Sequence, residues 1–459
     1  MYTYIMRQVK KFSRKSLQIR LLCIDVILLL FSVVLSLIIR NGSIGHGSHL
    51  RSVIISFLPV IAFYLIFMYT IELYNIDKYY SLTHLIQAFS YSSFASLLFA
   101  SFIFYFSPQR NTLPKRILIF FCIISIITLV ISRKIFYKVN LQQKLPIVFI
   151  GYNSTVKSLL KHTQSTYISY EPVAIFTQSP IQYDNIHILS TVDELKKYIY
   201  AHQHINTFVI DKTTHSDELT SYILSGHHWG ITTIPLDTFY EHLLRRVPIK
   251  NIDIHSIIST ANIKNKKVYI KVKRMFDIMV SLIGLIVSLP ILLLAACLIK
   301  IYDRGPVFFK QKRKGYAGSI FTIYKLRTMS IEDNGNSFLK QNEQRITKPG
   351  KILRKIRVDE LPQLFNVLKG DMSLIGPRPD YVDFADYLET SLPIYQYRYV
   401  VKPGITGWDQ ICGTYHSSTI KDTSMKLEYD FYYIKNMSFF LDVSICFKTI
   451  MTIFRMQGK

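Results

Sequence analysis

Acidic residues are scarce in this chain of 459 residues: Asp and Glu number 30 against 55 Lys and Arg, which gives a formal net charge of +25. Such an excess attracts polyanions, which include nucleic acid, anionic lipid and phosphorylated metabolites. Glycine and proline are also few, at 18 and 16, which excludes collagen-like and low-complexity chains. Apolar residues make up 49% of the chain. That share excludes a disordered protein, and it favours a membrane protein over one that binds nucleic acid.

Cysteine is scarce too, and the five residues form neither a CxxC motif nor a paired framework. Three of them, Cys23, Cys122 and Cys297, lie in apolar runs. We therefore expect small buried side chains in a reducing compartment rather than disulfides or a zinc site.

Four long apolar runs occupy the first third of the chain. Each has about 20 residues, which is enough for a helix to cross a hydrocarbon layer of ~30 Å. The first run is too long for a cleaved signal peptide, and no small-residue cleavage site follows it. We predict a four-helix transmembrane region over residues 1–140, with spans at Ile19–Ile39, Val53–Leu73, Leu85–Phe106 and Ile117–Phe136.

Basic residues indicate the orientation of these spans. They precede the first run and follow the fourth, so both ends are expected in the cytoplasm. Arg110, Lys115 and Arg116 in the third loop run against this pattern. Asp25 is the only acid in the first run, and an interhelical hydrogen bond is a simpler role for it than transport.

The middle of the chain, residues 146–260, changes character. Short apolar runs that alternate with helical stretches predict a small parallel α/β domain, with strands at Pro146–Ile150, Thr207–Ile210 and Ile231–Ile234. Only Gly151 stands where a dinucleotide-binding loop needs three glycines. A folded spacer or dimerisation module is therefore preferred to an enzyme that modifies nucleotide sugars through this domain.

A fifth apolar run, Ile278–Ile299, is long enough to span but contains Pro290. Proline breaks or kinks a helix, and basic residues flank the run on both sides, which places both of its ends in the cytoplasm. A re-entrant helix over residues 275–301 satisfies both facts, with Ser288 meeting backbone groups that the break frees. The alternative is a kinked fifth span, which would place the rest of the chain outside the cell.

Candidate chemistry is concentrated in the last 190 residues. Lys325 and Arg327 are two apart in a predicted strand, so they share a face that suits either an anion or solvent. Asp359 and Glu360 precede an amphipathic helix, where they suit a phosphate site or, more simply, an N-cap and first turn. Arg378 lies between two prolines in a stiff loop, a setting that suits bidentate binding of phosphate.

Residues 268–459 resemble the catalytic domain of the polyisoprenyl-phosphate hexose-1-phosphate transferases, also called bacterial sugar transferases. Six motifs in the same order carry the resemblance: RMFD at 274–277, GPVFFKQ at 305–311, YKLRTM at 324–329, DELPQL at 359–364, GDMSLIGPRP at 370–379 and KPGITGW at 402–408. The whole chain resembles the large form of this family. The fold that this implies is an α+β membrane protein with four transmembrane helices, a degenerate Rossmann-like α/β middle domain and a mixed α/β catalytic domain with a re-entrant helix.

The resemblance implies a reaction at the bacterial inner (cytoplasmic) membrane, with the catalytic domain on its cytoplasmic face. A UDP-sugar donates sugar-1-phosphate to undecaprenyl phosphate, and UMP leaves. The product begins a capsule, exopolysaccharide or O-antigen repeat. Expected partners are these two substrates, membrane lipids and a second copy of the chain as a homodimer, with no nucleic acid. The alternative is a non-catalytic membrane scaffold for polysaccharide assembly.

The resemblance also implies roles for individual residues. Asp359 is the nucleophile that forms an aspartyl-phosphosugar, and Glu360, with or without Asp359, holds Mg²⁺. Phosphates are expected at Lys325, Arg327, Arg354 and Arg378, and the break of the re-entrant helix is expected at Ser288 and Pro290.

One departure from the family pattern concerns a Gly-Arg pair, for which this chain has Gly413 and Thr414. If the missing arginine contacts the donor, Arg398 is a candidate to replace it. The stretch Phe439–Phe454 is too interrupted to span, so we expect a helix at the membrane interface or an ordinary buried helix.

Overall fold

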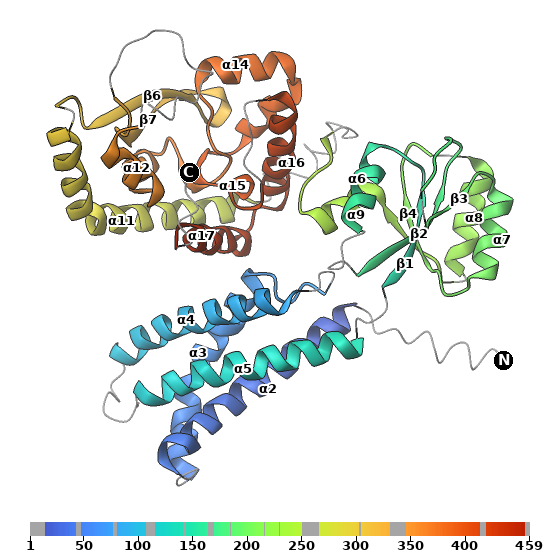
Figure 1. Ribbon diagram of the computed structural model, residues 1–459, viewed down its shortest axis with the longest axis horizontal. Coiled ribbons are helices and arrows are strands. Elements are labelled where there is room, and N and C mark those ends of the chain that lie inside the picture. The colour runs from blue at the N-terminus through green and yellow to red at the C-terminus, as the bar shows by residue number, and fades with distance from the viewer. Residues whose placement is uncertain are drawn as a thin grey trace. The chain divides into compact units, whose positions relative to one another are not determined.

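The computed structural model describes residues 14–42, 47–76, 80–106, 115–140, 144–163, 169–183, 185–214, 216–228, 230–249, 266–302, 304–330, 346–413 and 419–454. The chain forms two compact units, residues 1–239 and 240–459 (Figure 1).

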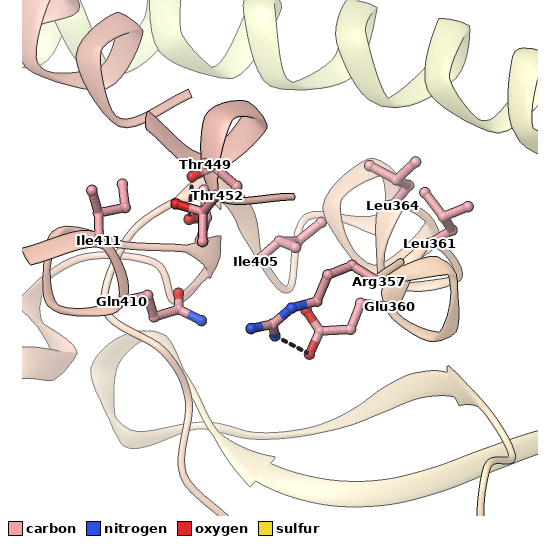
Figure 2. Close-up of a pocket in the computed structure, with 10 residues that line it drawn as sticks. Arg357, Glu360, Leu361, Leu364, Ile405, Gln410, Ile411, Thr449 and Thr452 are labelled. Atoms are coloured by element: carbon pink, nitrogen blue, oxygen red, sulfur yellow. Dashed lines mark hydrogen bonds and ion pairs between the residues drawn. The ribbon is translucent and has the colours of Figure 1, made fainter. Parts of the chain in front are cut away.

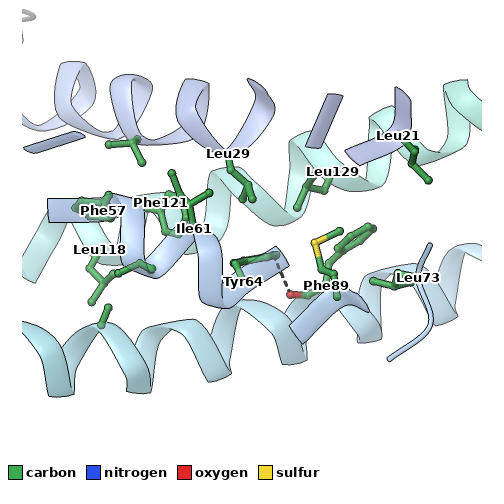
Figure 3. Packing of buried hydrophobic residues seen from close by; sticks show 14 of the residues in the cluster. Leu21, Leu29, Phe57, Ile61, Tyr64, Leu73, Phe89, Leu118, Phe121 and Leu129 are labelled. Atoms are coloured by element: carbon green, nitrogen blue, oxygen red, sulfur yellow. Dashed lines mark hydrogen bonds between the residues drawn. The ribbon is translucent and has the colours of Figure 1, made fainter. Parts of the chain in front are cut away.

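The first unit begins with four long antiparallel helices that pack together: α2 (Arg14–Asn41), α3 (Gly47–Thr70), α4 (Leu82–Phe106) and α5 (Lys115–Asn140). Their shared core holds Leu29, Phe57, Tyr64 and Phe121, all at most 1% exposed, and Figure 3 shows these side chains between the helices. The outer faces carry exposed apolar side chains such as Ile27. The four predicted runs are therefore helices, each long and apolar enough to cross a membrane.

Asp25 on α2 binds Arg133 on α5, with 2.9 Å between Oδ2 and Nη2 and both side chains at most 1% exposed. The Arg133 guanidinium also lies 5.5 Å from the ring centre of Tyr74 and 5.7 Å from that of Phe89. This confirms that Asp25 makes an interhelical contact. Removal of either partner would leave a buried charge without compensation, which is costly.

A five-stranded sheet follows, with all strands parallel and in the order β3-β2-β1-β4-β5. The three predicted strands are confirmed as β1, β4 and β5, whereas β2 and β3 were missed. The strands are β1 (Leu145–Ile150), β2 (Tyr170–Phe176), β3 (His187–Leu189), β4 (Thr207–Ile210) and β5 (Thr232–Pro235), with helices α6 (Ser154–Thr163), α7 (Val192–Ala201), α8 (Asp217–His228) and α9 (Leu236–Leu244).

In such a sheet, ligands bind where the strand order reverses, at the ends of β1 and β4. Here the chain itself occupies that place. Asn153 donates to Asp211 Oδ2 at 2.7 Å, and a Cβ on Gly151 would lie 2.4 Å from Thr214 Oγ1. These contacts agree with the sequence argument against a dinucleotide site.

The second unit contains a long helix, a β-hairpin, a parallel pair of short strands and several shorter helices. Its elements are α11 (Lys267–Tyr302), β6 (Phe308–Lys314), η3 (Tyr316–Gly318), β7 (Ile320–Leu326), α12 (Lys348–Lys355), η5 (Val358–Glu360), α13 (Gln363–Lys369), β8 (Ser373–Ile375), α14 (Val382–Ser391), η6 (Pro393–Val400), β9 (Gly404–Thr406), α15 (Trp408–Cys412), α16 (Ile420–Asn436) and α17 (Phe439–Phe454). β6 and β7 pair antiparallel, and β8 and β9 pair parallel. The core includes Tyr395, Trp408, Phe431 and Tyr433, all at most 1% exposed.

Helix α11 contains Pro290 and changes direction along its course in Figure 1. Its first part is tied to α13, because Arg274 donates to the carbonyls of Val367 (2.6 Å) and Leu368 (2.9 Å). In its last part, Ala295 and Ile299 are buried in a cluster with residues of β7, α12 and η5. Both arms of the helix therefore pack on the same small domain.

Between these anchors α11 is strongly apolar and exposed. Ile286 and Val287 are 65% and 67% exposed, and the helix is the fifth in the described part of the chain that is long and apolar enough to cross a membrane. Ser288 Oγ donates to the carbonyl of Leu285 at 3.3 Å, whereas the carbonyl that Pro290 leaves without its helical donor is that of Ile286, so the role given to Ser288 stays a prediction.

Candidate functional site

Strand β7 supplies the first cation of the site. Its side chains alternate, so Phe321 and Ile323 enter the core, and Lys325 continues along the same face toward η5. There Lys325 Nζ lies 3.3 Å from Glu360 Oε1. Burial, together with the positive charge of Arg378, lowers the pKa of Lys325 to about 8.

The Asp359–Glu360 pair lies in a single 3-10 turn, η5, that follows Arg357. Arg357 has φ 58° and ψ 19°, a left-handed conformation that is uncommon for a residue with a Cβ. This reversal ends α12 and turns the two carboxylates inward. Helix α13 begins later, with Pro362 at its N-cap and no capping side chain. The prediction that Asp359 caps this helix is therefore wrong, although Pro362 does mark the start of the helix.

Glu360 is held by three cations. Its Oε1 lies 2.7 Å from Arg378 Nη2, 3.3 Å from Lys325 Nζ and 3.8 Å from Arg357 Nη1. Burial alone would raise the pKa of Glu360, but the charges of Arg378 and Lys325 outweigh it and hold the pKa well below its usual range. Glu360 is thus a fixed anion that organises the cations around it.

Asp359 is placed differently. The residue is 8% exposed, and its buried Oδ1 has no hydrogen-bond partner. Burial, together with the negative charge of Glu360, raises the pKa of Asp359, while Lys325 and Arg354 oppose that rise. One oxygen of the Asp359 carboxylate therefore has no hydrogen-bond partner, whereas the carboxylate of Glu360 is already engaged.

The sequence also assigns phosphate binding to Arg354 and Arg327. Arg354 Nε donates to Thr328 Oγ1 at 2.9 Å, and its charge acts to lower the pKa of Asp359. Arg327 follows the end of β7 and is 7% exposed, and its backbone N–H donates to the carbonyl of Val307. The ion pairs at Glu360 come from Lys325, Arg357 and Arg378, so the predicted pairing of Lys325 with Arg327 at one ligand gains no support here.

The loop that presents Arg378 is supported from behind by Arg398. Arg398 is 3% exposed and donates to the carbonyl of Arg378 at 2.8 Å and to Asp430 Oδ2 at 2.8 Å; it also pairs with Asp380. Lys426 Nζ completes the network at 2.9 Å from Asp380 Oδ2. Because Arg398 is buried and fully engaged, it does not suit the suggested role of replacing a donor-binding arginine. Thr414 lies outside the described residues.

A pocket of about 170 Å³ adjoins Glu360 (Figure 2). Arg357 and Glu360 form one end, and the amide of Gln410 points toward the Arg357 guanidinium. The other walls are largely apolar, and the lining residues are Arg357, Glu360, Leu361, Leu364, Ile405, Thr406, Gln410, Ile411, Thr449 and Thr452.

Sequence reasoning missed the part played by Arg357 and Gln410. Neither residue has a local signature, because the left-handed turn at Arg357 and the half-buried position of Gln410 depend on packing between segments far apart in the chain. The one available signal for Arg357 was its place two residues before the acidic pair.

The described residues hold no cluster of three or more His, Cys, Asp or Glu that could bind a metal by themselves. Mg²⁺, however, is often bound by one or two carboxylates, with water and substrate phosphates completing its shell. The unpartnered Oδ1 of Asp359 fits that pattern. Glu360 fits less well, because its Oε1 is already paired with Arg378 and Lys325.

The segment that holds this site is similar to known proteins. A family model described as "Bacterial sugar transferase" matches residues 268–456. The chain is 48% identical over 188 residues to a UDP-N-acetylgalactosamine-undecaprenyl-phosphate N-acetylgalactosaminephosphotransferase of Aeromonas hydrophila, which covers 40% of this chain and 44% of that protein. It is 34% identical over 262 residues to an undecaprenyl-phosphate galactose phosphotransferase of Salmonella typhimurium, with 51% and 52% covered. The chain therefore matches about half the length of these two relatives.

A third relative is matched over most of its length. The uncharacterized sugar transferase EpsL of Bacillus subtilis is 43% identical over 190 residues, which is 40% of this chain and 89% of that protein. The residues that the family model matches include the hairpin, the acidic pair and the Arg378 loop described above. The chain thus belongs to the bacterial sugar transferase family.

Proposed function

We propose that the protein transfers sugar-1-phosphate from a UDP-sugar to undecaprenyl phosphate and so initiates a capsule, exopolysaccharide or O-antigen repeat. The relatives named for undecaprenyl-phosphate sugar phosphotransfer support the acceptor. The observation that carries the proposal is the contrast within the acidic pair. Glu360 is bound by three cations, whereas the adjacent Asp359 has a buried oxygen without a partner.

The reaction proceeds in two displacements on phosphorus. A carboxylate oxygen of Asp359 attacks the β-phosphorus of the donor, the bond from that phosphorus to the UMP oxygen breaks, and UMP leaves. An oxygen of the acceptor phosphate then attacks the same phosphorus and displaces the Asp359 carboxylate. The products are a lipid diphosphosugar and regenerated Asp359.

Phosphoryl transfer depends mainly on positioning and on neutralisation of charge. Lys325, Arg354 and Arg378 surround the pair and are placed to bind phosphate oxygens, with Glu360 fixing the first and last of them. Mg²⁺ at Asp359, with or without Glu360, would neutralise further phosphate charge when bound. Arg327 lies nearby but has the weakest case for a phosphate contact.

For membrane placement, we propose four spans and a re-entrant α11 in the bacterial inner membrane, with the catalytic domain on the cytoplasmic face. The support is that Arg274 and Ile299, near opposite ends of α11, both pack on that domain. If α11 were straight and spanned the membrane, the 25 residues from Arg274 to Ile299 would set these two anchors about 38 Å apart, on opposite sides of a hydrocarbon layer of ~30 Å, and one domain could not hold both. The homodimer stays a prediction, which mass photometry of the purified protein can check.

The test uses the full chain in nanodiscs with Mg²⁺, undecaprenyl phosphate and a panel of UDP-sugars, and it follows release of UMP. We expect one or a few donors to support turnover in the wild type, and Asp359→Ala to abolish it. Mass spectrometry of the wild type with donor alone should find a phosphosugar on the peptide that contains Asp359. A folded wild type that releases no UMP with any donor would favour the scaffold function instead.

A further inference from the structure

The pocket beside the acidic pair has two different ends. Arg357 and Glu360 close one end, and Leu361, Leu364, Ile405 and Ile411 supply apolar walls. Figure 2 shows Leu361 and Leu364 on the side nearer α11, with the two charged residues farther from that helix. A ligand that follows the pocket therefore runs from a cation toward the membrane-associated helix.

Arg357 is the least engaged cation of the site. Its Nη1 is 3.8 Å from Glu360 Oε1, beyond hydrogen-bond distance, and its side chain is 34% exposed. Arg378 and Lys325 stand closer to the same oxygen, at 2.7 and 3.3 Å. The Arg357 guanidinium thus keeps N–H donors for an added phosphate, and the Gln410 amide faces the same point.

The apolar end of the pocket adjoins two helices, α11 and α17, that expose apolar side chains. A Cβ on Gly284 of α11 would lie 3.1 Å from Leu364, so this wall of the pocket abuts α11. The opposite wall includes Thr449 and Thr452 of α17, and the intervening Ile450 is 47% exposed. A chain that leaves the pocket here would pass onto apolar surface rather than into water.

The threonine hydroxyl groups in the pocket already have hydrogen-bond partners within the protein, so they do not require a polar ligand. Thr449 Oγ1 donates to Ile445 O and Thr452 Oγ1 to Lys448 O, both at 2.8 Å. Thr406 and Thr449 also share a hydrogen bond of 2.7 Å. Their hydroxyl groups are satisfied, and they present methyl groups, whereas a sugar would bring several hydroxyls that need partners.

We propose that this pocket is the acceptor subsite: it holds the first prenyl units of the lipid phosphate, with the phosphate beside Arg357. The assignment rests on the proposed function and locates one of its two substrates. The acceptor would then bind apart from the donor, whose phosphates would bind to Lys325, Arg354 and Arg378.

Thr452→Trp tests the assignment, because it fills the pocket from a helix that is only partly buried. Thr390→Trp on α14 is the matched control, since Thr390 is exposed and does not line the pocket. Both are made in the full chain in nanodiscs. The donor half-reaction is followed as exchange of labelled UMP into UDP-sugar without acceptor, and the full reaction is followed against the concentration of undecaprenyl phosphate.

We expect Thr452→Trp to raise the acceptor KM at least tenfold while UMP exchange stays within twofold of the wild type. An equal loss of exchange would assign the pocket to the donor, and an unchanged acceptor KM would also overturn the proposal. Native mass spectrometry with undecaprenyl phosphate provides a readout independent of turnover. If the wild type binds this lipid, Thr452→Trp blocks binding and no donor supports exchange, the pocket assignment stands and the proposed reaction fails.

Discussion

Arg378 Nη2 lies 2.7 Å from Glu360 Oε1, and this pair joins two segments that the sequence separates by 18 residues. The carbonyl of Arg378 is in turn held by Arg398. The geometry of the candidate site therefore depends on a chain of charged contacts that begins in the buried network of Asp380 and Asp430.

Glu360→Gln should lower the stability of the folded protein and make that stability depend on a bound anion. The change leaves Lys325, Arg357 and Arg378 without their common carboxylate, and an uncompensated cluster of charges in a partly buried site costs on the order of 2–4 kcal/mol. UDP should restore part of the loss by supplying phosphate charge. The measurement is the thermal midpoint in detergent with and without UDP.

Glu218→Gln is the matched control for that experiment. Glu218 pairs with Lys196 on the surface of the middle domain, where its side chain is 61% exposed, and exposed pairs of this kind contribute little. Its midpoint should stay close to that of the wild type. A Glu360→Gln protein as stable as this control, and indifferent to UDP, would contradict the role given to Glu360.

Arg357→Gly should be more stable than Arg357→Ala by about 1 kcal/mol, because only a residue with a Cβ is strained at φ 58°. Both variants lose the same charge, so their difference isolates the backbone. At Lys351, in the interior of α12, the same two changes should rank in the opposite order, with Gly about 1 kcal/mol below Ala. Chemical denaturation of the four variants measures both differences. If the Ala variant is the more stable one at both positions, Arg357 is not strained.

The buried network behind Arg378 predicts a dependence of stability on pH. Burial raises the pKa of Asp430 to about 7 and that of Asp409 to about 6. Lys426 and Arg398 overcome burial and keep the pKa of Asp380 far below its usual range, so Asp380 stays ionised throughout. Between about pH 4 and 7 the folded chain therefore retains protons that the unfolded chain has lost.

The sign follows from proton binding: stability falls as pH rises through this window, and the loss is complete above about pH 7. Each unit of pKa difference corresponds to about 1.4 kcal/mol. Asp430→Asn keeps an acceptor for Arg398 but cannot titrate, so its thermal midpoint should fall less between pH 5 and 8 than that of the wild type. If the thermal midpoints of Asp430→Asn and the wild type change equally with pH, Asp430 is not the group that causes the pH dependence.

Much of the fold could be predicted from local patterns. Apolar runs of fixed length indicated helices α2 to α5, and short apolar runs indicated β1, β4 and β5. These helices and strands depend on residue type and near neighbours. In the site, local patterns left Lys325, Asp359 and Glu360 undecided, and the resemblance to the sugar transferase family assigned them, with Arg378, to the site in which the structure brings them together.

Other features could not be predicted because they depend on distant contacts. Nothing near Arg133 in the sequence indicates that it pairs with Asp25, 108 residues away. Arg398 was a candidate to contact the donor, yet tertiary packing buries it. The basic run Lys310–Lys314 lies in a strand because it pairs with β7, a contact that its own residues do not indicate.

Pro290→Ala should shift part of the population toward a membrane-spanning α11. A proline inside a helix removes one hydrogen bond and costs about 3 kcal/mol, so its loss favours a straight helix, while docking of both arms on the catalytic domain opposes this. Pro59→Ala is the matched control, because Pro59 lies inside α3, a helix expected to span in either case.

The side of the membrane on which the C-terminus lies is read by two fusions after Lys459, a split fluorescent protein completed in the cytoplasm and a phosphatase active only outside. The wild type and Pro59→Ala should report the cytoplasm alone, and Pro290→Ala should add a measurable phosphatase signal. A phosphatase signal from the wild type would show that α11 spans, which would also separate the acidic pair from its cytoplasmic donor. If Pro290→Ala stays cytoplasmic, the contacts of Arg274 and Ile299 with the catalytic domain, rather than the proline, hold the re-entrant course.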